Sequence, residues 1–136
     1  MAEKSFTLEI VTPKKVVFKG EVESFSAPGV LGSFQVLYNH APLLSAIKIG
    51  ESKLTLADGL EKSIASGAGF VEVRKNHVVM LAESAELAGE IDAERAKAAE
   101  QRARKRLDEK KEDIDFDRAQ AALHRALNRL KISGRL

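Results

Sequence analysis

Four arginines near the C-terminal end of the chain have the spacing of a binding site for a phosphate-bearing ligand. Arg95 and Arg102 are seven residues apart, and Arg125 and Arg129 are four apart, so on helices each pair occupies one face. In an antiparallel helical hairpin, Arg102 comes level with Arg125 and Arg95 comes roughly level with Arg129. Guanidinium groups that converge in this way repel one another unless an anion neutralises them, and their planar fork fits phosphate oxygens. One interpretation of this spacing is therefore an anion-binding patch.

Two carboxylates, Glu86 and Asp92, lie beside these arginines in the sequence. An anionic ligand with a polar sugar or base would satisfy both the arginines and the carboxylates. The alternative is that the arginines extend into water or pair with Glu94 and Asp117. The residues alone give the two interpretations similar weight.

No residues suited to catalysis accompany this patch. The sequence shows no paired carboxylates and no Ser/His/Asp set near the arginines. The chain has no cysteine, and His40, His77 and His124 do not fall at a metal-ligand spacing. We therefore expect a protein without a catalytic site and without a structural metal.

The elements that position the arginines begin where the sequence changes character, around residue 90. Eight of the nine glycines precede this point, and all arginines except Arg74 follow it. Strand-like alternation gives way to helical periodicity at the same place. We place a β domain at residues 1–88 and a helical domain at residues 89–136.

An internal repeat predicts where two helices start. Residues 91–96 and 114–119 share the pattern Ile-Asp-x-x-Arg-Ala, 23 residues apart. In each copy the Asp is a suitable N-cap, and an acidic residue in the first turn favours the positive end of the helix dipole. We expect the first helix to run to about Lys111 and the second to about Lys131. The short connection Glu112–Ile114 favours an antiparallel hairpin or, if the joint straightens, one long rod.

Small apolar side chains should form the contact between these helices. The expected facing residues are Ala96, Ala99, Ala103 and Leu107 on the first helix and Phe116, Ala119, Leu123, Ala126 and Leu130 on the second. At roughly 25 cal/mol per Å² of buried apolar surface, alanines stabilise a helix contact less than leucines do. The hairpin should be marginal alone, which suits either a switching element or a hairpin that docks on a larger partner.

The first 88 residues read as short strands separated by turns. Phe6, Leu8 and Ile10 alternate with polar residues, and turn signals recur about every ten residues, as in a small sandwich or barrel. Further hairpins are expected around Asp58-Gly59 and between Val73 and Val78. We attribute the pair Gly67 and Gly69 to close backbone approach within the sheet, because a strand and not a helix follows them.

One segment of this domain, residues 29–44, departs from a simple strand pattern. His40-Ala41-Pro42 interrupts an apolar run, and proline removes a donor from any strand ladder. One interpretation is a loop or edge with exposed apolar side chains, which commonly marks an interface. The other is a buried crossover in which a backbone carbonyl satisfies His40. The interface residues predicted by the first interpretation are His40, Ala41, Pro42, Leu43 and Leu44.

Composition narrows the class of protein. The 136 residues are 44% apolar and 31% charged, as in ordinary soluble proteins. The sequence has no apolar run of eighteen residues and no signal-peptide pattern, so we expect a protein that stays inside the cell without a membrane span of its own. Residues 1–90 carry 9 Lys and Arg against 11 Asp and Glu, whereas residues 91–136 carry 13 against 9. A basic helical region suggests an acidic partner, a phosphate ligand or nucleic acid, or only a solvated helix.

Four motifs in sequence order carry a resemblance to a known family. They are Thr12-Pro13, the segment His40-Ala41-Pro42-Leu43-Leu44, Gly67-x-Gly69-Phe70-x-Glu72-Val73 and Ile91-Asp92-x-x-Arg95-Ala96. With the Ala- and Arg-rich region that follows, the chain resembles the epsilon subunit of bacterial-type F-type ATP synthases over nearly its whole length. It differs where the family usually reads Gly-Glu-Leu-Gly, because this chain has Gly32-Ser33-Phe34-Gln35, and Asn39 replaces a common glycine.

The resemblance implies an α+β protein with a ten-stranded N-terminal β-sandwich followed by a two-helix hairpin. It implies a non-catalytic part of the rotating central stalk, bound to the gamma subunit and the membrane c-ring at the cytoplasmic face of the bacterial plasma membrane. In such proteins the helices fold down or extend toward the catalytic beta subunits, and the extended form inhibits ATP hydrolysis. Some members hold the folded-down form with one ATP. Their ATP-binding residues correspond here to Glu86, Asp92, Arg95, Arg102, Arg125 and Arg129, and neither the residues nor the resemblance specifies a need for Mg²⁺.

The alternative from another class is a small β-barrel that binds nucleic acid and carries a basic helical tail. Only 5% of residues are aromatic and Tyr38 is the sole tyrosine, so aromatic platforms for base stacking are scarce. We therefore expect no nucleic-acid partner.

Overall fold

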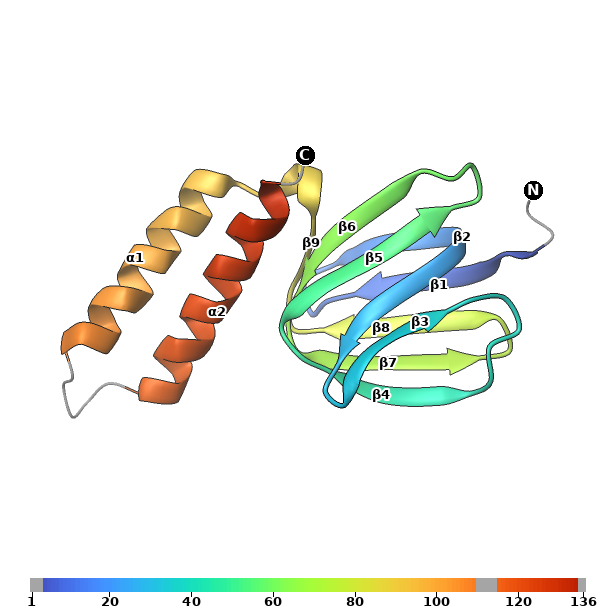
Figure 1. Cartoon of the computed structure of the whole chain (residues 1–136), viewed down its shortest axis with the longest axis horizontal. Helices are drawn as coiled ribbons and strands as arrows, with labels where there is room; N and C mark the ends of the chain where they lie inside the picture. The colour runs from blue at the N-terminus through green and yellow to red at the C-terminus, as the bar shows by residue number, and fades with distance from the viewer. Residues whose placement is uncertain (1–3, 110–114, 135–136) are drawn as a thin grey trace. The chain divides into compact units, whose positions relative to one another are not determined.

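The computed structural model describes residues 4–109 and 115–134 of the chain. The chain divides into two compact units, Met1–Leu87 and Ala88–Leu136. The first is built from strands and the second from helices (Figure 1).

The described part of the first unit contains nine strands joined into one sheet. They are β1 (Phe6–Val11), β2 (Val16–Gly29), β3 (Gly32–Val36), β4 (Leu43–Ile47), β5 (Gly50–Leu56), β6 (Glu61–Ser66), β7 (Gly69–Arg74), β8 (His77–Ala82) and β9 (Ala85–Leu87).

The first hairpin shows how sequence pattern becomes structure. Phe6, Leu8 and Ile10 are buried while the residues between them are partly exposed, as expected for a strand with one face in the core. β1 pairs antiparallel with β2, with Ile10 opposite Phe18. At the turn, the hydroxyl of Thr12 accepts hydrogen bonds from the backbone N–H groups of the two lysines that end it. The predicted N-terminal hairpin is confirmed.

The long strand β2 explains why the described residues contain nine strands where the family resemblance implied ten. β2 is 14 residues long. Its first half pairs with β1, and its second half pairs with β3 and β5. The register shifts between Val22 and Ser24 opposite β5, and such a bulge lets a strand bend without ending.

The sheet closes on itself because β1 has two partners. β1 is antiparallel to β2 and parallel to β8, so β1, β8, β7, β4 and β2 form a ring of paired strands. The core inside this ring is apolar, and its largest fully buried side chains include Phe6, Leu8, Ile10, Phe25, Leu54, Ile64 and Met80. The predicted sandwich or barrel is therefore confirmed as a closed β-sandwich.

The later hairpins and the paired glycines also agree with the sequence. β5 and β6 pair across the turn that contains Asp58-Gly59, and Gly59 adopts a φ of +88°. β7 and β8 pair across Lys75-Asn76. A Cβ at Gly69 would overlap the Leu81 carbonyl, and one at Gly67 would lie 2.8 Å from the Ser84 hydroxyl. Close backbone approach is thus the reason for both glycines.

The segment 29–44 is only partly the loop that the sequence predicted. Residues 32–36 form β3, which pairs with β2 at Gly29, Pro28 and beyond, and Leu43 already begins β4. The loop itself is confined to residues 37–42. A strand can begin at Leu43 because Pro42 lies directly before it and removes none of its hydrogen bonds.

The second unit is a pair of antiparallel helices. It contains the short 3-10 helix η2 (Ala88–Glu90), α1 (Ala93–Glu109) and α2 (Phe116–Ser133), and α1 packs along α2 (Figure 1). The predicted N-caps are confirmed, because the Asp92 and Asp115 carboxylates accept from the backbone N–H groups of Arg95 and Arg118 at 3.1 and 3.0 Å. The predicted first helix end at Lys111 and the connection Glu112–Ile114 lie outside the described residues.

Most of the predicted helix contact is confirmed. Ala96, Ala103, Ala119 and Ala126 are each at most 4% exposed. Ala99, Leu107, Leu123 and Leu130 are half-buried. The inclusion of Phe116 was wrong, because its side chain is 54% exposed at the first residue of α2.

Neither described helix is long and apolar enough to cross a membrane. The described residues also contain no group of three or more histidine, aspartate or glutamate side chains that could hold a metal ion.

Candidate functional site

The predicted anion site lies on the two helices of the second unit. Arg95 and Arg102 are exposed on α1, and Arg125 and Arg129 are half-buried on α2. At about 100° per residue, the two α1 arginines lie within about 20° of each other around the helix axis. Each lies about 100° from the buried alanine that directly follows it, so the two arginines flank the helix contact and do not enter it. The arginines are therefore placed at the edge of the contact.

The helix bounds set the arginines at matching heights. Arg102 lies midway along α1 and Arg125 midway along α2, so antiparallel packing brings the two to the same level. Arg95 lies in the first turn of α1, and Arg129 lies about one turn from the end of α2. The level pairing predicted from the sequence is consistent with these bounds.

Asp92 is the N-cap of α1. Its carboxylate caps α1 through the backbone N–H of Arg95, at 3.1 Å. A capping carboxylate keeps further lone pairs for a second partner. Asp92 is exposed, so a ligand can reach its side chain.

Glu86 is the one predicted site residue outside the helical unit. It lies on β9, is half-buried, and its backbone pairs with Ala65 of β6. The structure thus groups Asp92 and the four arginines in one unit and places Glu86 in the other.

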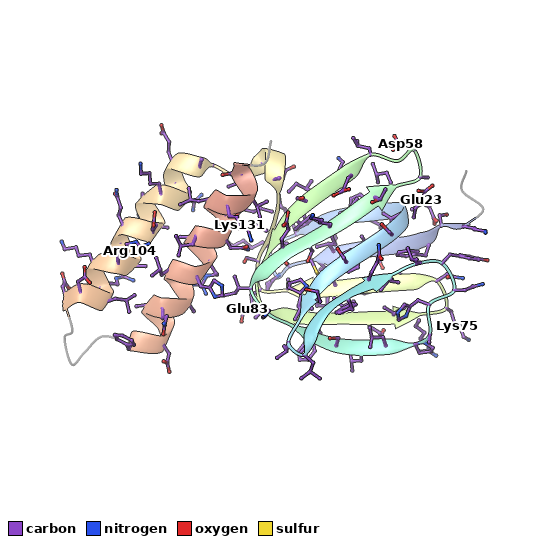
Figure 2. The ribbon with its side chains drawn as sticks, in the orientation of Figure 1. Glu23, Asp58, Lys75, Glu83, Arg104 and Lys131 are labelled. Atoms are coloured by element: carbon purple, nitrogen blue, oxygen red, sulfur yellow. The ribbon has the colours of Figure 1, made fainter. Side chains whose placement is uncertain are left out.

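The ion pairs of the helices leave this face positively charged. Arg104, labelled in Figure 2, pairs with Glu100 at 3.0 Å, one turn earlier on α1. Among residues 4–109 and 115–134, Arg95, Arg102 and Arg125 form no ion pair, and neither do Glu94 and Asp117. The alternative in which the arginines pair with these two acids is therefore not realised. The face can accept an anion through guanidinium forks.

The predicted interface segment lies on the surface of the β unit. His40 Nδ1 is 2.6 Å from the Ala41 carbonyl oxygen, while Ala41 and Pro42 are exposed. Leu43 is half-buried, and Leu44 is 69% exposed. The structure thus favours the exposed apolar loop over the buried crossover, although a carbonyl does satisfy His40.

An apolar strip that we did not predict from the sequence lies on the outside of the sheet. Val11 pairs with Leu81, Leu81 with Phe70, and Phe70 with Ala46, so these four side chains lie in one row across β1, β8, β7 and β4. Phe70 and Leu81 are 55% and 54% exposed. We call this row, together with Leu44, the apolar strip. It borders a groove of about 680 Å³ whose lining includes Thr12, Pro13 and Glu83.

A signal for the apolar strip is present in the sequence. In β8, Val78 and Met80 fill the core while Val79 and Leu81 point away from it, so apolar residues occupy both faces of one strand. A strand with one face in water normally alternates apolar and polar residues. The unbroken apolar run at residues 78–81 is therefore the pattern that marks a second covered face.

Comparison with known proteins gives matches over the whole chain. Residues 5–88 match the β-sandwich domain of the ATP synthase delta/epsilon chain, and residues 90–134 match its long α-helix domain. Among curated proteins, the chain is 50% identical over 135 residues to the ATP synthase epsilon chain of Pelotomaculum thermopropionicum, covering 99% of this chain and 100% of that protein. It is 44% identical over 133 residues to the epsilon chain of Syntrophomonas wolfei, covering 98% and 97%, and 45% identical over 132 residues to that of Bacillus subtilis, covering 97% and 99%.

Solved structures show the same fold at lower sequence identity. A chain in the Euglena gracilis mitochondrial ATP synthase assembly of OSCP, F1 and c-ring matches with a TM-score of 0.75 and 19% identity, covering 88% of this chain and 76% of that one. A chain in the Tetrahymena thermophila central stalk and c-ring matches with a TM-score of 0.54 and 12% identity, covering 95% and 93%. The sequence matches over both units, at well above 30% identity, establish that the chain belongs to the ATP synthase delta/epsilon chain family.

Proposed function

We propose that the chain is the epsilon subunit of a bacterial ATP synthase, a non-catalytic part of the central stalk whose helical unit regulates ATP hydrolysis. The observation that carries this proposal is the match of both units, in order and over nearly the full length, to epsilon chains. The subunit would reach the cytoplasmic face of the membrane through the complex and not by a span of its own.

The β unit is the proposed seat of assembly. Its apolar strip exposes a phenylalanine and two leucines on the outside of an otherwise complete sandwich, and exposed apolar patches of this kind are typical of protein interfaces. We propose that this strip contacts the gamma subunit. The loop at residues 37–42, with Leu37 52% and Tyr38 41% exposed, is a second apolar surface, and we propose that it faces the c-ring.

The helical unit is the proposed regulator. Residues 91–136 carry 13 Lys and Arg against 9 Asp and Glu, so an extended form would be attracted to an acidic segment of the catalytic beta subunits. The alanine contact between α1 and α2 buries little apolar area. A hairpin held weakly in this way can separate for a modest free energy, as a switch requires.

ATP is the proposed regulatory ligand of the folded hairpin. Arg95, Arg102, Arg125 and Arg129 would hold the phosphates, and Glu86 and Asp92 would contact the ribose or base. Arg95, Arg102 and Arg125 support this assignment, because they form no ion pair among the described residues and each can give a phosphate oxygen a charge-assisted hydrogen bond. ATP would then favour the state in which both helices are packed.

Binding of gamma by the β unit alone tests the assembly part. The β unit has a closed sheet and a core of its own, so residues 1–88 should fold without the helices. We expect tagged residues 1–88 to capture purified gamma as well as the full chain does, and Phe70→Glu in the full chain to reduce capture. Retention of full binding by Phe70→Glu, with loss of binding on removal of residues 89–136, would place the gamma contact on the helices instead.

A further inference from the structure

The Ile-Asp-x-x-Arg-Ala repeat extends along both helices. When residues 91–107 are aligned with residues 114–130, ten of the seventeen positions are identical. The identical positions include three arginines in each copy: Arg95, Arg102 and Arg106 on α1, and Arg118, Arg125 and Arg129 on α2. The function proposed above uses four of these six and leaves Arg106 and Arg118 without a role.

The two copies are alike in structure as well as in sequence. In each copy the Asp caps its helix by accepting from the backbone N–H of the first arginine, at 3.1 Å in α1 and 3.0 Å in α2. The alanine after the first arginine and the alanine after the second are at most 4% exposed in both helices. The helices therefore start in the same way and face each other through equivalent residues.

This equivalence places all six arginines on one side of the hairpin. Two equivalent antiparallel helices that meet through equivalent residues are related by a two-fold axis perpendicular to the plane that contains them. Rotation about such an axis keeps each side of the hairpin on the same side. Within each helix the three arginines span about 40° around the axis and lie about 100° from the buried alanines. The arginines of α1 and α2 therefore form two rows along one face.

The two-fold relation divides this face into two similar halves. Arg102 and Arg125 lie near the axis, because each is midway along its helix. Arg95 and Arg129 lie toward the end of the hairpin where α1 begins. Arg106 and Arg118 lie toward the opposite end, about 6 Å along the helix from Arg102 and about 10 Å from Arg125 at a rise of 1.5 Å per residue. Each half offers a first-turn arginine of one helix and a late arginine of the other.

The second half is available to a ligand. Arg106 and Arg118 are exposed, and neither forms an ion pair within the part of the chain that the structure describes. On the helical positions of the repeat, Asp108 lies about 160° around α1 from Arg106, and Asp117 lies about 100° around α2 from Arg118. Glu109 lies on the arginine side of α1, about 60° around the helix from Arg106 and about 20° from Arg102.

We propose that Arg106 and Arg118 form a second oligophosphate subsite, related by the internal two-fold axis to the subsite of Arg95 and Arg129, with Arg102 and Arg125 between the two. The ligand class is a chain of phosphates, since guanidinium forks on opposite helices suit successive phosphate groups. The inference builds on the proposed function only in taking the first half of the face as the ATP site.

Titration of the full chain with inorganic tripolyphosphate tests the second subsite. We expect the wild-type chain to bind two tripolyphosphates. Arg106→Ala with Arg118→Ala should weaken one site by at least about tenfold, since one charge-assisted hydrogen bond is worth about 1.5 kcal/mol or more. Arg95→Ala with Arg129→Ala should weaken the other site. The control, Arg104→Ala with Lys105→Ala, also removes two positive charges but on other sides of α1, and should leave both sites.

The same variants separate this inference from the ATP assignment. Circular dichroism of each variant checks that the helices remain folded. A single tripolyphosphate site in the wild-type chain, or a control variant that loses as much binding as Arg106→Ala with Arg118→Ala, would overturn the second subsite even if ATP binds. Two tripolyphosphate sites with the expected losses would support it even if a parallel titration with ATP shows no binding.

Discussion

At the scale of single residues, Glu9 on the outer face of β1 lies between two basic side chains. Its carboxylate oxygens are 2.7 Å from His77 Nε2 on β8 and 3.7 Å from Lys19 Nζ on β2. The hydrogen bond with His77 is the largest cause of the lowered pKa of Glu9; desolvation opposes it, and the charge of Lys19 adds to it. Glu9 thus links the two strands that pair with β1.

This geometry predicts a pH-dependent effect of Glu9→Gln. A carboxyl whose pKa is lower in the folded state stabilises that state above its unfolded pKa of about 4.3, and this stabilisation is lost as the pH falls through the folded-state pKa. Urea unfolding should therefore show Glu9→Gln less stable than the wild type at pH 7, with the difference shrinking in acid. Glu72→Gln, on β7, is the control, because the side chain of Glu72 has no hydrogen bond or ion pair within the described residues. If Glu72→Gln loses as much stability at pH 7 as Glu9→Gln does, the hydrogen bond between Glu9 and His77 is not what stabilises the fold.

At the scale of elements, the helical hairpin depends on its ends as much as on its contact. The alanine contact buries little area per residue, so the caps are a large share of what holds each helix. Asp115 accepts from the Arg118 N–H at 3.0 Å, and the Gly134 N–H bonds back to the Leu130 carbonyl at 3.2 Å. Both ends of α2 are therefore closed by specific hydrogen bonds.

Removal of the N-cap of α2 should lower the temperature at which the hairpin unfolds. Loss of an Asp N-cap costs about 0.5–2 kcal/mol, so Asp115→Ala should lower the melting temperature of the helical circular dichroism signal. Asp117→Ala is the matched variant: it removes an acid from the same first turn that caps nothing, and should cost about 0.3–1 kcal/mol through the helix dipole. If Asp117→Ala destabilises the helix as much as Asp115→Ala, the cap is not what holds α2.

The sequence predicted elements well where the signal is local. The caps at Asp92 and Asp115, the turn at Gly59 and the β7–β8 hairpin each depend on a few neighbouring residues, and all are confirmed. The exposure of Phe116 was missed, because helical periodicity alone cannot tell whether the first turn of a helix reaches its partner.

Features that depend on residues far apart in the sequence could not be predicted from local patterns. The parallel pairing of β1 with β8 joins residues about 70 positions apart, and no local pattern specifies it. The extent of the apolar strip depends on the same pairing: Phe70 and Leu81 become neighbours through the local β7–β8 hairpin, but Val11 joins Leu81 only through the pairing of β1 with β8. The arginine spacing, by contrast, was readable because each stripe lies within one helix.

At the scale of the whole molecule, charge is divided unequally between the two parts of the chain. Residues 1–90 carry 9 basic and 11 acidic side chains, and residues 91–136 carry 13 and 9. Salt screens the attraction between a basic segment and an acidic partner. At physiological ionic strength the screening length is about 8 Å. The regulatory contact proposed for the helices should therefore respond to salt.

Hydrolysis by the reconstituted complex checks this regulatory role. We expect complexes with the full chain to hydrolyse ATP more slowly than complexes with residues 1–88, because only the full chain can extend helices toward the catalytic subunits. Added salt should narrow the difference by weakening the charge attraction. Identical rates with the full and truncated chains would show that the helices do not inhibit this enzyme.

Calorimetric titration of the isolated chain with ATP is the decisive measurement for the proposed regulatory site. Binding at one hundred times Kd would stabilise the folded hairpin by about 2.7 kcal/mol, enough to matter for a contact made of alanines. Arg102→Ala and Arg125→Ala should each weaken ATP binding by about 10- to 150-fold, the equivalent of one charge-assisted contact of roughly 1.5–3 kcal/mol. Lysine at either position should restore only part of the lost ATP affinity, because its ammonium group lacks the planar, two-pronged geometry of a guanidinium. The control variant Arg104→Ala should bind ATP as the wild type does. No heat from the wild-type chain at millimolar ATP, or wild-type affinity in Arg102→Ala and Arg125→Ala, would contradict the proposed ATP site.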